Sequence, residues 1–218
     1  MKRASRRPLL VTGFEPFGGE SVNPSWQVAQ ALHGRRIGGA PVVAALLPCA
    51  FGAALDQLKL ALAEHRPQLV LALGQAGGRS ELCLERVAIN LDDARIADNL
   101  GQQPIDEAVV PGAAAAYFST LPIKAIVAAL REAGVPATVS PSAGNYVCNH
   151  VFFGLQHALA GSGARSGFMH LPLLPEQAAR APGQPSLGLT TMVRGVALAL
   201  AVALRETIDL RQTGGSLG

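Results

Sequence analysis

A cysteine at the predicted start of a helix is the first residue in this sequence whose type and position favour covalent chemistry. It lies in the segment SPSAGNYVCNH (140–150), which joins a short apolar run to a helical pattern, and Asn145 is placed to cap that helix. Capping there puts Cys148 in the first helical turn, where backbone amides are free and the helix dipole favours an anion. We therefore expect a thiol with a lowered pKa and amides that can hold an oxyanion; the alternative is a buried structural cysteine.

A thiolate nucleophile needs a histidine base from another element, and His170 is the best placed of the five histidines. It closes the apolar stretch 167–170, a predicted strand, so it is expected at the carboxyl edge of a parallel sheet together with Cys148. His150 lies two residues after Cys148 on the same helix and points away from it, and His157 is out of phase. Spacing alone leaves open which acid orients the imidazole. The candidates are Glu15, Glu85, Asp92 and Asp93.

The other cysteines rank lower as nucleophiles. Cys49 also lies between a predicted strand and a helix, but it lacks the Gly/Asn/Ser approach of Cys148, and Cys83 lies in a predicted irregular loop. Three cysteines without a C-x-x-C motif leave at least one thiol free of internal pairing and predict a cytoplasmic location. The sequence has no H-E-x-x-H motif or His/Cys cluster, so no metal or cofactor is expected.

Two glycine-rich loops follow predicted strands without forming a nucleotide-binding motif. The first, TGFEPFGG (12–19), is not G-x-G-x-x-G and lacks a Walker lysine, and it carries Phe14 and Phe17 where a phosphate cradle needs bare amides. These two side chains either pack into the core or form walls for a flat, uncharged ligand. The second loop, GQAGG (74–78), allows close approach to the backbone, and Gln75 can hydrogen-bond a ligand amide or a turn.

The elements that must position these residues follow an alternation of short apolar runs and longer helical ones. Predicted strands span 9–12, 42–47, 69–73, 86–90, 137–140 and 167–171. Predicted helices span 24–32, 51–64, 123–133, 148–160 and 191–207, the first with Asn23 as its cap. Segments 74–85 and 97–112 are predicted as long loops. The alternation predicts one α/β domain with a largely parallel twisted sheet flanked by helices on both faces, an α/β/α sandwich.

Composition and charge exclude several classes of protein. With 49% hydrophobic and 15% charged residues among 218, the chain is not intrinsically disordered, and its length suits one domain. That domain is predicted at 8–210, between a basic tail at 1–7 and a flexible tail at 211–218. Four basic residues in the first seven account for the net charge of +3; the rest of the chain has 14 basic and 15 acidic residues, so no nucleic-acid partner is expected. The aliphatic run 196–204 is too short to span a membrane.

Four segments of the sequence together resemble one known family. They are TGFEPFGGESVNPSW (12–26), LERVAINLDDARIADNLGQQPID (84–106), PSAGNYVCNH (141–150) and FMHLPLLPEQ (168–177). In order, spacing and total chain length they are similar to pyroglutamyl peptidase I, also called pyrrolidone carboxyl peptidase, a family of cysteine peptidases. The resemblance covers most of the chain. It implies a hydrolase that removes an N-terminal pyroglutamyl residue from peptides, without metal or cofactor, and that works as a homotetramer.

The resemblance also implies roles for individual residues. It makes Cys148 the nucleophile, His170 the base and Glu85 the acid, a choice that spacing left open. It places Arg95 beside the site and has Asn23 support the first loop. The substrate pocket is implied to consist of Phe14, Phe17, Gln75, Ile96 and Tyr146. The sequence departs from the family pattern at Tyr146, where phenylalanine is usual, and at His150, where tyrosine is common and which is interpreted as incidental.

Two functions of other classes compete with this interpretation. A non-catalytic small-molecule binding domain on the same fold would keep the pocket and do no chemistry, but a complete set of Cys148, His170 and Glu85 argues against it. A nucleoside phosphorylase-like enzyme would need a cationic phosphate site. The glycine loops carry Phe14 and Phe17 where arginine or lysine would be needed for that role.

Overall fold

The computed structural model describes residues 6–214, which are built around an eight-stranded sheet. The strands are β1 (Leu9–Phe14), β2 (Arg36–Ile37), β3 (Ala40–Leu47), β4 (Leu69–Gln75), β5 (Leu82–Ile89), β6 (Ala116–Phe118), β7 (Ala137–Ser142) and β8 (Arg165–Leu171). Their order across the sheet is β2-β3-β1-β4-β8-β5-β6, and β7 pairs with β5. The two shortest strands, β2 and β6, were not predicted.

The strand directions make the sheet mixed but mostly parallel. Strands β3, β1, β4 and β8 run parallel to one another, whereas β5 is antiparallel to β8. Strand β7 is parallel to β5 and therefore runs opposite to β8, and β6 is antiparallel to β5. The expectation that Cys148 follows a strand parallel to the strand of His170 is therefore wrong. Strand β7, which precedes Cys148, runs opposite to β8, which carries His170.

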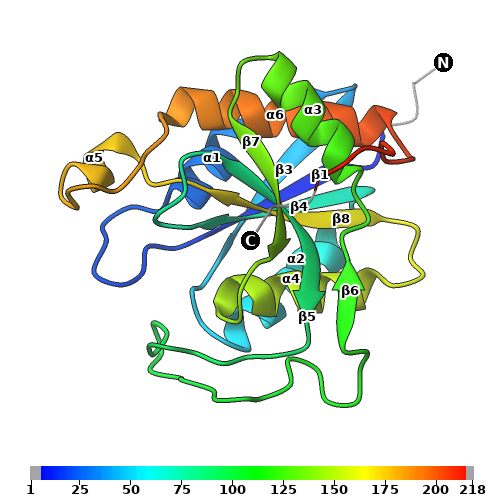
Figure 1. Ribbon diagram of the computed structural model, residues 1–218. Helices are drawn as coiled ribbons and strands as arrows, with labels where there is room; N and C mark the ends of the chain where they lie inside the picture. Colours follow the sequence, from blue (N-terminus) through cyan, green and yellow to red (C-terminus); the bar gives the residue numbers. More distant parts are fainter. Residues whose placement is uncertain (1–5, 215–218) are drawn as a thin grey trace.

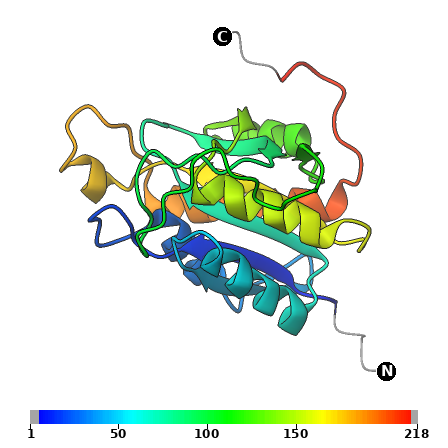
Figure 2. The ribbon, with the colours of Figure 1, turned by 90° about the horizontal axis from the view of Figure 1, so that it is seen from below.

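Helices cover both faces of the sheet, as Figure 1 shows. They are α1 (Pro24–Leu32), α2 (Ala53–His65), α3 (Ile123–Glu132), α4 (Val147–Leu159), α5 (Pro175–Ala178) and α6 (Leu189–Arg205). Helix α6 contacts both α1 and α3 on one face, and α2 and α4 lie side by side on the other (Figure 2). The predicted α/β/α sandwich is confirmed. No helix within residues 6–214 is long and apolar enough to cross a bilayer.

The central strands β1 and β4 are mostly apolar because both of their faces are covered. In β1, Leu9 and Val11 belong to the core under α1, α3 and α6, whereas Leu10 lies in the core under α2 and α4. In β4, Leu71 lies in the core under α1, α3 and α6, and Val70 lies in the core under α2 and α4. Successive side chains of a strand point to opposite faces, so a continuous apolar run fills two cores at once.

Local signals set some helix starts but not all of them. Asn23 caps α1 as predicted, and its Oδ1 accepts a hydrogen bond from the Ser25 amide at 3.0 Å. Asn145 does not cap α4: the cap residue is Tyr146, without a side-chain bond, and the Asn145 amide contacts Asp93 at 3.3 Å instead. The side chain of Asn145 therefore contacts Asp93 and makes no capping bond to α4.

The predicted tails lie partly outside the described residues, which leave out 1–5 and 215–218. The described ends of both tails contact the domain. Arg7 donates to the carbonyl of Arg66 at 2.8 Å, and the Gly214 carbonyl accepts a hydrogen bond from Arg86 at 2.9 Å. The boundaries at 8 and 210 stay a prediction.

Candidate active site

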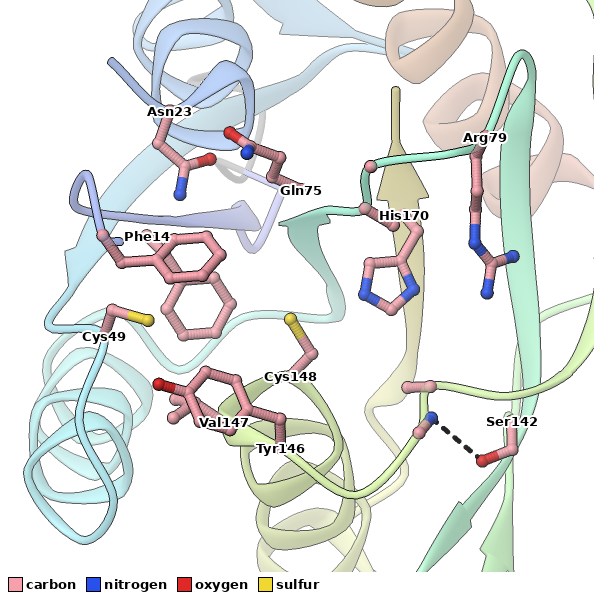
Figure 3. Close-up of a pocket in the computed structure, with 15 residues that line it drawn as sticks. Phe14, Asn23, Cys49, Gln75, Arg79, Ser142, Tyr146, Val147, Cys148 and His170 are labelled. Carbon is pink, nitrogen blue, oxygen red and sulfur yellow. Dashed lines mark hydrogen bonds between the residues drawn. The ribbon is translucent and has the colours of Figure 1, made fainter. Parts of the chain in front are cut away.

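A cavity of about 370 Å³ opens where β1, β4 and β8 end and α4 begins (Figure 3). Its wall combines residues from segments far apart in the sequence. They are Phe14, Phe17, Asn23, Cys49, Gln75, Ala76, Gly77, Arg79, Ser142, Ala143, Gly144, Tyr146, Val147, Cys148 and His170. The volume suits a small ligand such as a single amino-acid residue.

Cys148 enters this cavity from the first turn of α4. It is the second residue of the helix, where the backbone amides have no partner within the helix. The thiol lies against β4 at Gly74, where a Cβ atom would come within 2.8 Å of the Cys148 Sγ. A glycine at this position therefore makes room for the sulfur.

His170 and Glu85 meet across the antiparallel pair β5–β8. In the register of these strands, Cys83 lies opposite His170 and Glu85 lies opposite Phe168, so Glu85 and His170 are diagonal neighbours on one face. The Nδ1 of His170 is 2.7 Å from the Glu85 Oε1. Glu85 is fully buried and His170 is 4% exposed. Because Nδ1 is bonded to the carboxylate, Nε2 is the nitrogen left to exchange a proton in the cavity.

The environment of Cys148 changes its acidity in the direction opposite to the one expected from the helix start. Burial raises the pKa of the Cys148 thiol, and the neighbouring Cys49 and Glu85 raise it further, whereas Arg79 lowers it. Enclosure by the pocket wall outweighs the favourable helix terminus. A raised pKa favours the protonated thiol, so the proton has to leave the sulfur when it attacks.

Aromatic side chains form one side of the cavity. Phe14 is 2% exposed and lies both in the core and on the cavity wall, so the two expectations for this residue hold together. The rings of Phe17 and Tyr146 are 6.3 Å apart and inclined by 39°. The hydroxyl of Tyr146 donates to the Ala97 carbonyl at 3.1 Å, which gives the extra oxygen a partner at the rim.

Two amide side chains, those of Asn23 and Gln75, lie next to each other on one side of Phe14 in the cavity wall (Figure 3). The Oε1 of Gln75 accepts a hydrogen bond from Gln177 at 3.1 Å, which orients the Gln75 amide. Asn23 donates from Nδ2 to the Glu15 carbonyl at 3.0 Å, and its Oδ1 accepts from Ser25. Asn23 is thus occupied in shaping the loop that carries Phe14 and Phe17.

Comparisons with known proteins identify the family of this chain. A sequence profile of the pyroglutamyl peptidase family matches residues 7–206. The chain belongs to the pyroglutamyl peptidase family. It is 59% identical over 214 residues to a pyrrolidone-carboxylate peptidase of Cupriavidus pinatubonensis, covering 97% of this chain and 99% of the relative. The resemblance drawn from the four sequence segments is confirmed.

Solved structures of the pyroglutamyl peptidase family share the fold. Pyroglutamyl peptidase I of Bacillus amyloliquefaciens has a TM-score of 0.91 at 42% identity, with 94% of this chain and 100% of that one covered. Pyrrolidone carboxyl peptidase of Thermococcus litoralis has a TM-score of 0.90 at 39% identity, with 94% and 100% covered. The α/β architecture is therefore the family's own.

Not all residues that the resemblance to pyroglutamyl peptidases implied come together. Cys148, His170, Phe14, Phe17, Gln75 and Tyr146 line the cavity, and Glu85 lies behind His170. Arg95 and Ile96 do not line it; both are exposed on the loop after β5, and Ile96 is 45% exposed. Ile96 nevertheless precedes Ala97, whose carbonyl accepts the Tyr146 hydroxyl, so this loop lies at the rim.

Sequence reasoning gave no role to two residues at this site and misjudged a third, His150. Arg79, just after the second glycine loop, lines the cavity with its Nη2 3.6 Å from the Glu85 Oε1. Gln177 orients Gln75 from the unpredicted helix α5. His150 is not incidental: its Nδ1 is 2.7 Å from Asp92, and its Nε2 accepts from the Gly52 amide at 3.0 Å. A buried Asp–His pair far apart in sequence leaves no signal in spacing.

Proposed function

We propose that this chain hydrolyses the amide bond after an N-terminal pyroglutamyl residue of peptides, with Cys148 as the nucleophile. The observation that carries the proposal is the convergence of Cys148 and a His170–Glu85 pair on one cavity, with 2.7 Å between Nδ1 and Oε1. Membership of the pyroglutamyl peptidase family supports the choice of substrate. A cysteine, a histidine and an orienting carboxylate are the groups that acyl transfer requires.

The proposed reaction begins with a proton transfer. The Cys148 sulfur attacks the pyroglutamyl carbonyl carbon while its proton moves to the Nε2 of His170, and Glu85 stabilises the resulting imidazolium. The tetrahedral intermediate collapses as His170 gives that proton to the leaving amine, which leaves a thioester on Cys148. Water then attacks the thioester with His170 as base, releasing pyroglutamate and restoring the thiol.

The oxyanion of this intermediate needs donors near the sulfur. The backbone amide of Cys148 is in the first turn of α4, where amides lack helical partners, and we assign it this role. Arg95, which the resemblance placed beside the site, lies on the rim loop and would act only from there. The Cys148 amide is accordingly the donor on which the mechanism relies.

Specificity in this proposal follows from the shape and polarity of the pyroglutamyl ring. The ring is a flat lactam with one N–H, one C=O and no charged amine, so Phe14, Phe17 and Tyr146 suit its faces. Gln75 and nearby backbone groups supply hydrogen bonds for the lactam, and Ile96 would cover it from the rim. A site that pairs a buried amide rejects an analogue that lacks it.

The proposal of an oligomeric state rests on the family resemblance, and the proposal of a location rests on the cysteine pattern of the sequence. We propose a homotetramer located in the cytoplasm. Size-exclusion chromatography with light scattering measures the first, and fractionation of cells that express the protein measures the second. A monomer in solution, or recovery with the membrane or an extracellular fraction, would contradict these two proposals.

Hydrolysis of a fluorogenic pyroglutamyl amide under reducing conditions tests the reaction and the nucleophile together. We expect turnover by the wild type and a loss of at least about a thousandfold in Cys148→Ala. Cys83→Ala is the matched control, because Cys83 is buried but does not line the cavity. Equal turnover in Cys148→Ala would move the chemistry to another thiol, with Cys49 next. No turnover by a folded wild type would favour a binding domain.

A further inference from the structure

Arg79 lies at the active site but has no role in the reaction described above. It follows the glycines 77 and 78 in the connection between β4 and β5 and lines the same cavity as Cys148 and His170. Its Nη2 is 3.6 Å from the Glu85 Oε1, and its side chain is about one-third exposed. In Figure 3 the guanidinium lies beyond His170, on the side away from Phe14 and Gln75.

The need for such a group follows from the burial of Glu85. This carboxylate is 0% exposed, its Oε1 contacts His170, and its Oε2 has no hydrogen-bond partner within the described residues. A histidine that has yet to receive the Cys148 proton carries no charge, so it does not neutralise the carboxylate. A buried charge without a partner of opposite sign is strongly unfavourable. Among residues 6–214, Arg79 is the only arginine or lysine within 4.0 Å of Glu85.

We infer that Arg79 is the counter-ion of the Glu85–His170 pair and a positioning residue for catalysis, acting through Glu85 and the charge balance around the Cys148 sulfur. This inference rests on the proposed function. Before attack, the carboxylate and guanidinium balance each other. During attack, negative charge develops on the sulfur and then on the oxyanion, positive charge develops on His170, and Arg79 keeps the site from carrying an excess negative charge.

The acidity of Cys148 gives this role a measurable consequence. Titratable or charged groups surround the thiol from several elements: Cys49 before α2, Arg79 before β5, Tyr146 before α4 and His170 on β8. Glu85 on β5 lies behind His170, and Cys83 on β5 interacts with Arg79. Burial, Cys49 and Glu85 raise the pKa of Cys148, and Arg79 lowers it. Removing the arginine charge must therefore raise that pKa, whereas removing the glutamate charge must lower it.

The experiment compares Arg79→Gln and Arg79→Lys with the wild type, with Arg194→Gln as the control. Arg194 is an exposed arginine of α6, away from the cavity, so its replacement makes the same charge change without touching the site. The rate at which iodoacetamide alkylates Cys148 is followed by mass spectrometry across pH. In Arg79→Gln we expect this profile to move to higher pH by about one unit and kcat/KM for a pyroglutamyl amide to fall about tenfold or more. Arg79→Lys should keep an alkylation profile and a kcat/KM close to those of the wild type.

A structural role alone would lower the melting temperature without moving the alkylation profile. If Arg79→Gln is unstable, the double variant Arg79→Gln/Glu85→Gln separates the two effects, because it removes both charges of the buried pair. It should recover stability, with an alkylation profile between those of the two single variants. Two results would overturn the inference. One is a folded Arg79→Gln or double variant whose alkylation profile does not shift as stated, and the other is an Arg79→Gln variant with wild-type kcat/KM. Failure of the proposed function is distinct: it appears as an inactive wild type or an active Cys148→Ala.

Discussion

Replacing Gly74 by alanine should disable the site by moving the nucleophile. A Cβ atom at this position would be 2.8 Å from the Cys148 Sγ and 2.8 Å from the Phe168 ring, where ordinary contacts are 3.4–4 Å. The sulfur and the ring must therefore each retreat by about 0.6–1.2 Å to restore van der Waals contact. Gly74 adopts no left-handed conformation, so backbone strain does not contribute.

The size of the effect can be worked out from this displacement. Overpacking of this kind costs about 1–3 kcal/mol of stability. A misplacement of about 1 Å in a reacting group costs about a hundredfold in rate. We expect kcat of Gly74→Ala to fall about a hundredfold, with a smaller change in KM because the aromatic wall and Gln75 are not displaced directly.

The assay is steady-state hydrolysis of a fluorogenic pyroglutamyl amide, combined with thermal unfolding. The control is Gly188→Ala, since a Cβ atom there meets nothing within 4 Å. That variant should keep kcat close to the wild type, with only a small loss of melting temperature, because Gly188 is the N-cap of α6 and alanine is a poorer cap. A stable Gly74→Ala with wild-type kcat would refute the argument, because the sulfur would then have tolerated the shift or would not be the reacting atom.

Three further predictions concern specificity, pH and stability. A prolyl amide should be cleaved at least about a hundredfold more slowly than the pyroglutamyl amide in kcat/KM, because it lacks the lactam carbonyl, and equal rates would contradict the pocket described here. Burial, with Glu15 and Asp98, raises the pKa of Cys49 to about 12, whereas an unfolded cysteine has a pKa of about 8.5. Between these two pH values the folded state holds a proton that the unfolded state has released, so the contribution of Cys49 to stability is full below about pH 8.5 and is lost as pH rises toward 12. Denaturant unfolding at pH 7 and 10 should show that the free energy of unfolding falls less between these pH values in Cys49→Ala than in the wild type. An identical fall in both proteins would contradict this role of Cys49. His150→Phe should lower the free energy of unfolding by about 3–5 kcal/mol, since it leaves the Asp92 carboxylate buried without its partner, and Asp92→Leu/His150→Phe should recover part of that loss in the same measurement.

Much of the framework could be predicted because its signals are local. Helix α1 was predicted with the bounds that the structure shows, and its start follows from an asparagine cap and a proline at the first position. The central strands were predicted because continuous apolar runs suit a sheet covered on both faces. Strands β2 and β6 were missed because two or three exposed or half-exposed residues pair only through their neighbours.

Glu85 illustrates where local reasoning ended. The sequence placed it at the end of a predicted loop and left four acids open. In the structure it lies inside β5, facing His170 diagonally across an antiparallel pair. Strand direction and register are set by the packing of the whole sheet, which no short segment encodes. Only the family resemblance could choose Glu85 in advance.

The sequence by itself determined the chemical inventory: a cysteine at a helix start, a histidine at the end of a buried strand, aromatic and glycine-rich loops, and the family to which they belong. These features depend on residue type and local spacing, so they can be read along the chain. The tertiary structure decided the electrostatics. It enclosed Cys148 so that its pKa rises, paired Glu85 with His170 and brought Arg79 to 3.6 Å from that carboxylate. Such effects arise from burial and from distances between segments remote in sequence, and both exist only once the chain has folded.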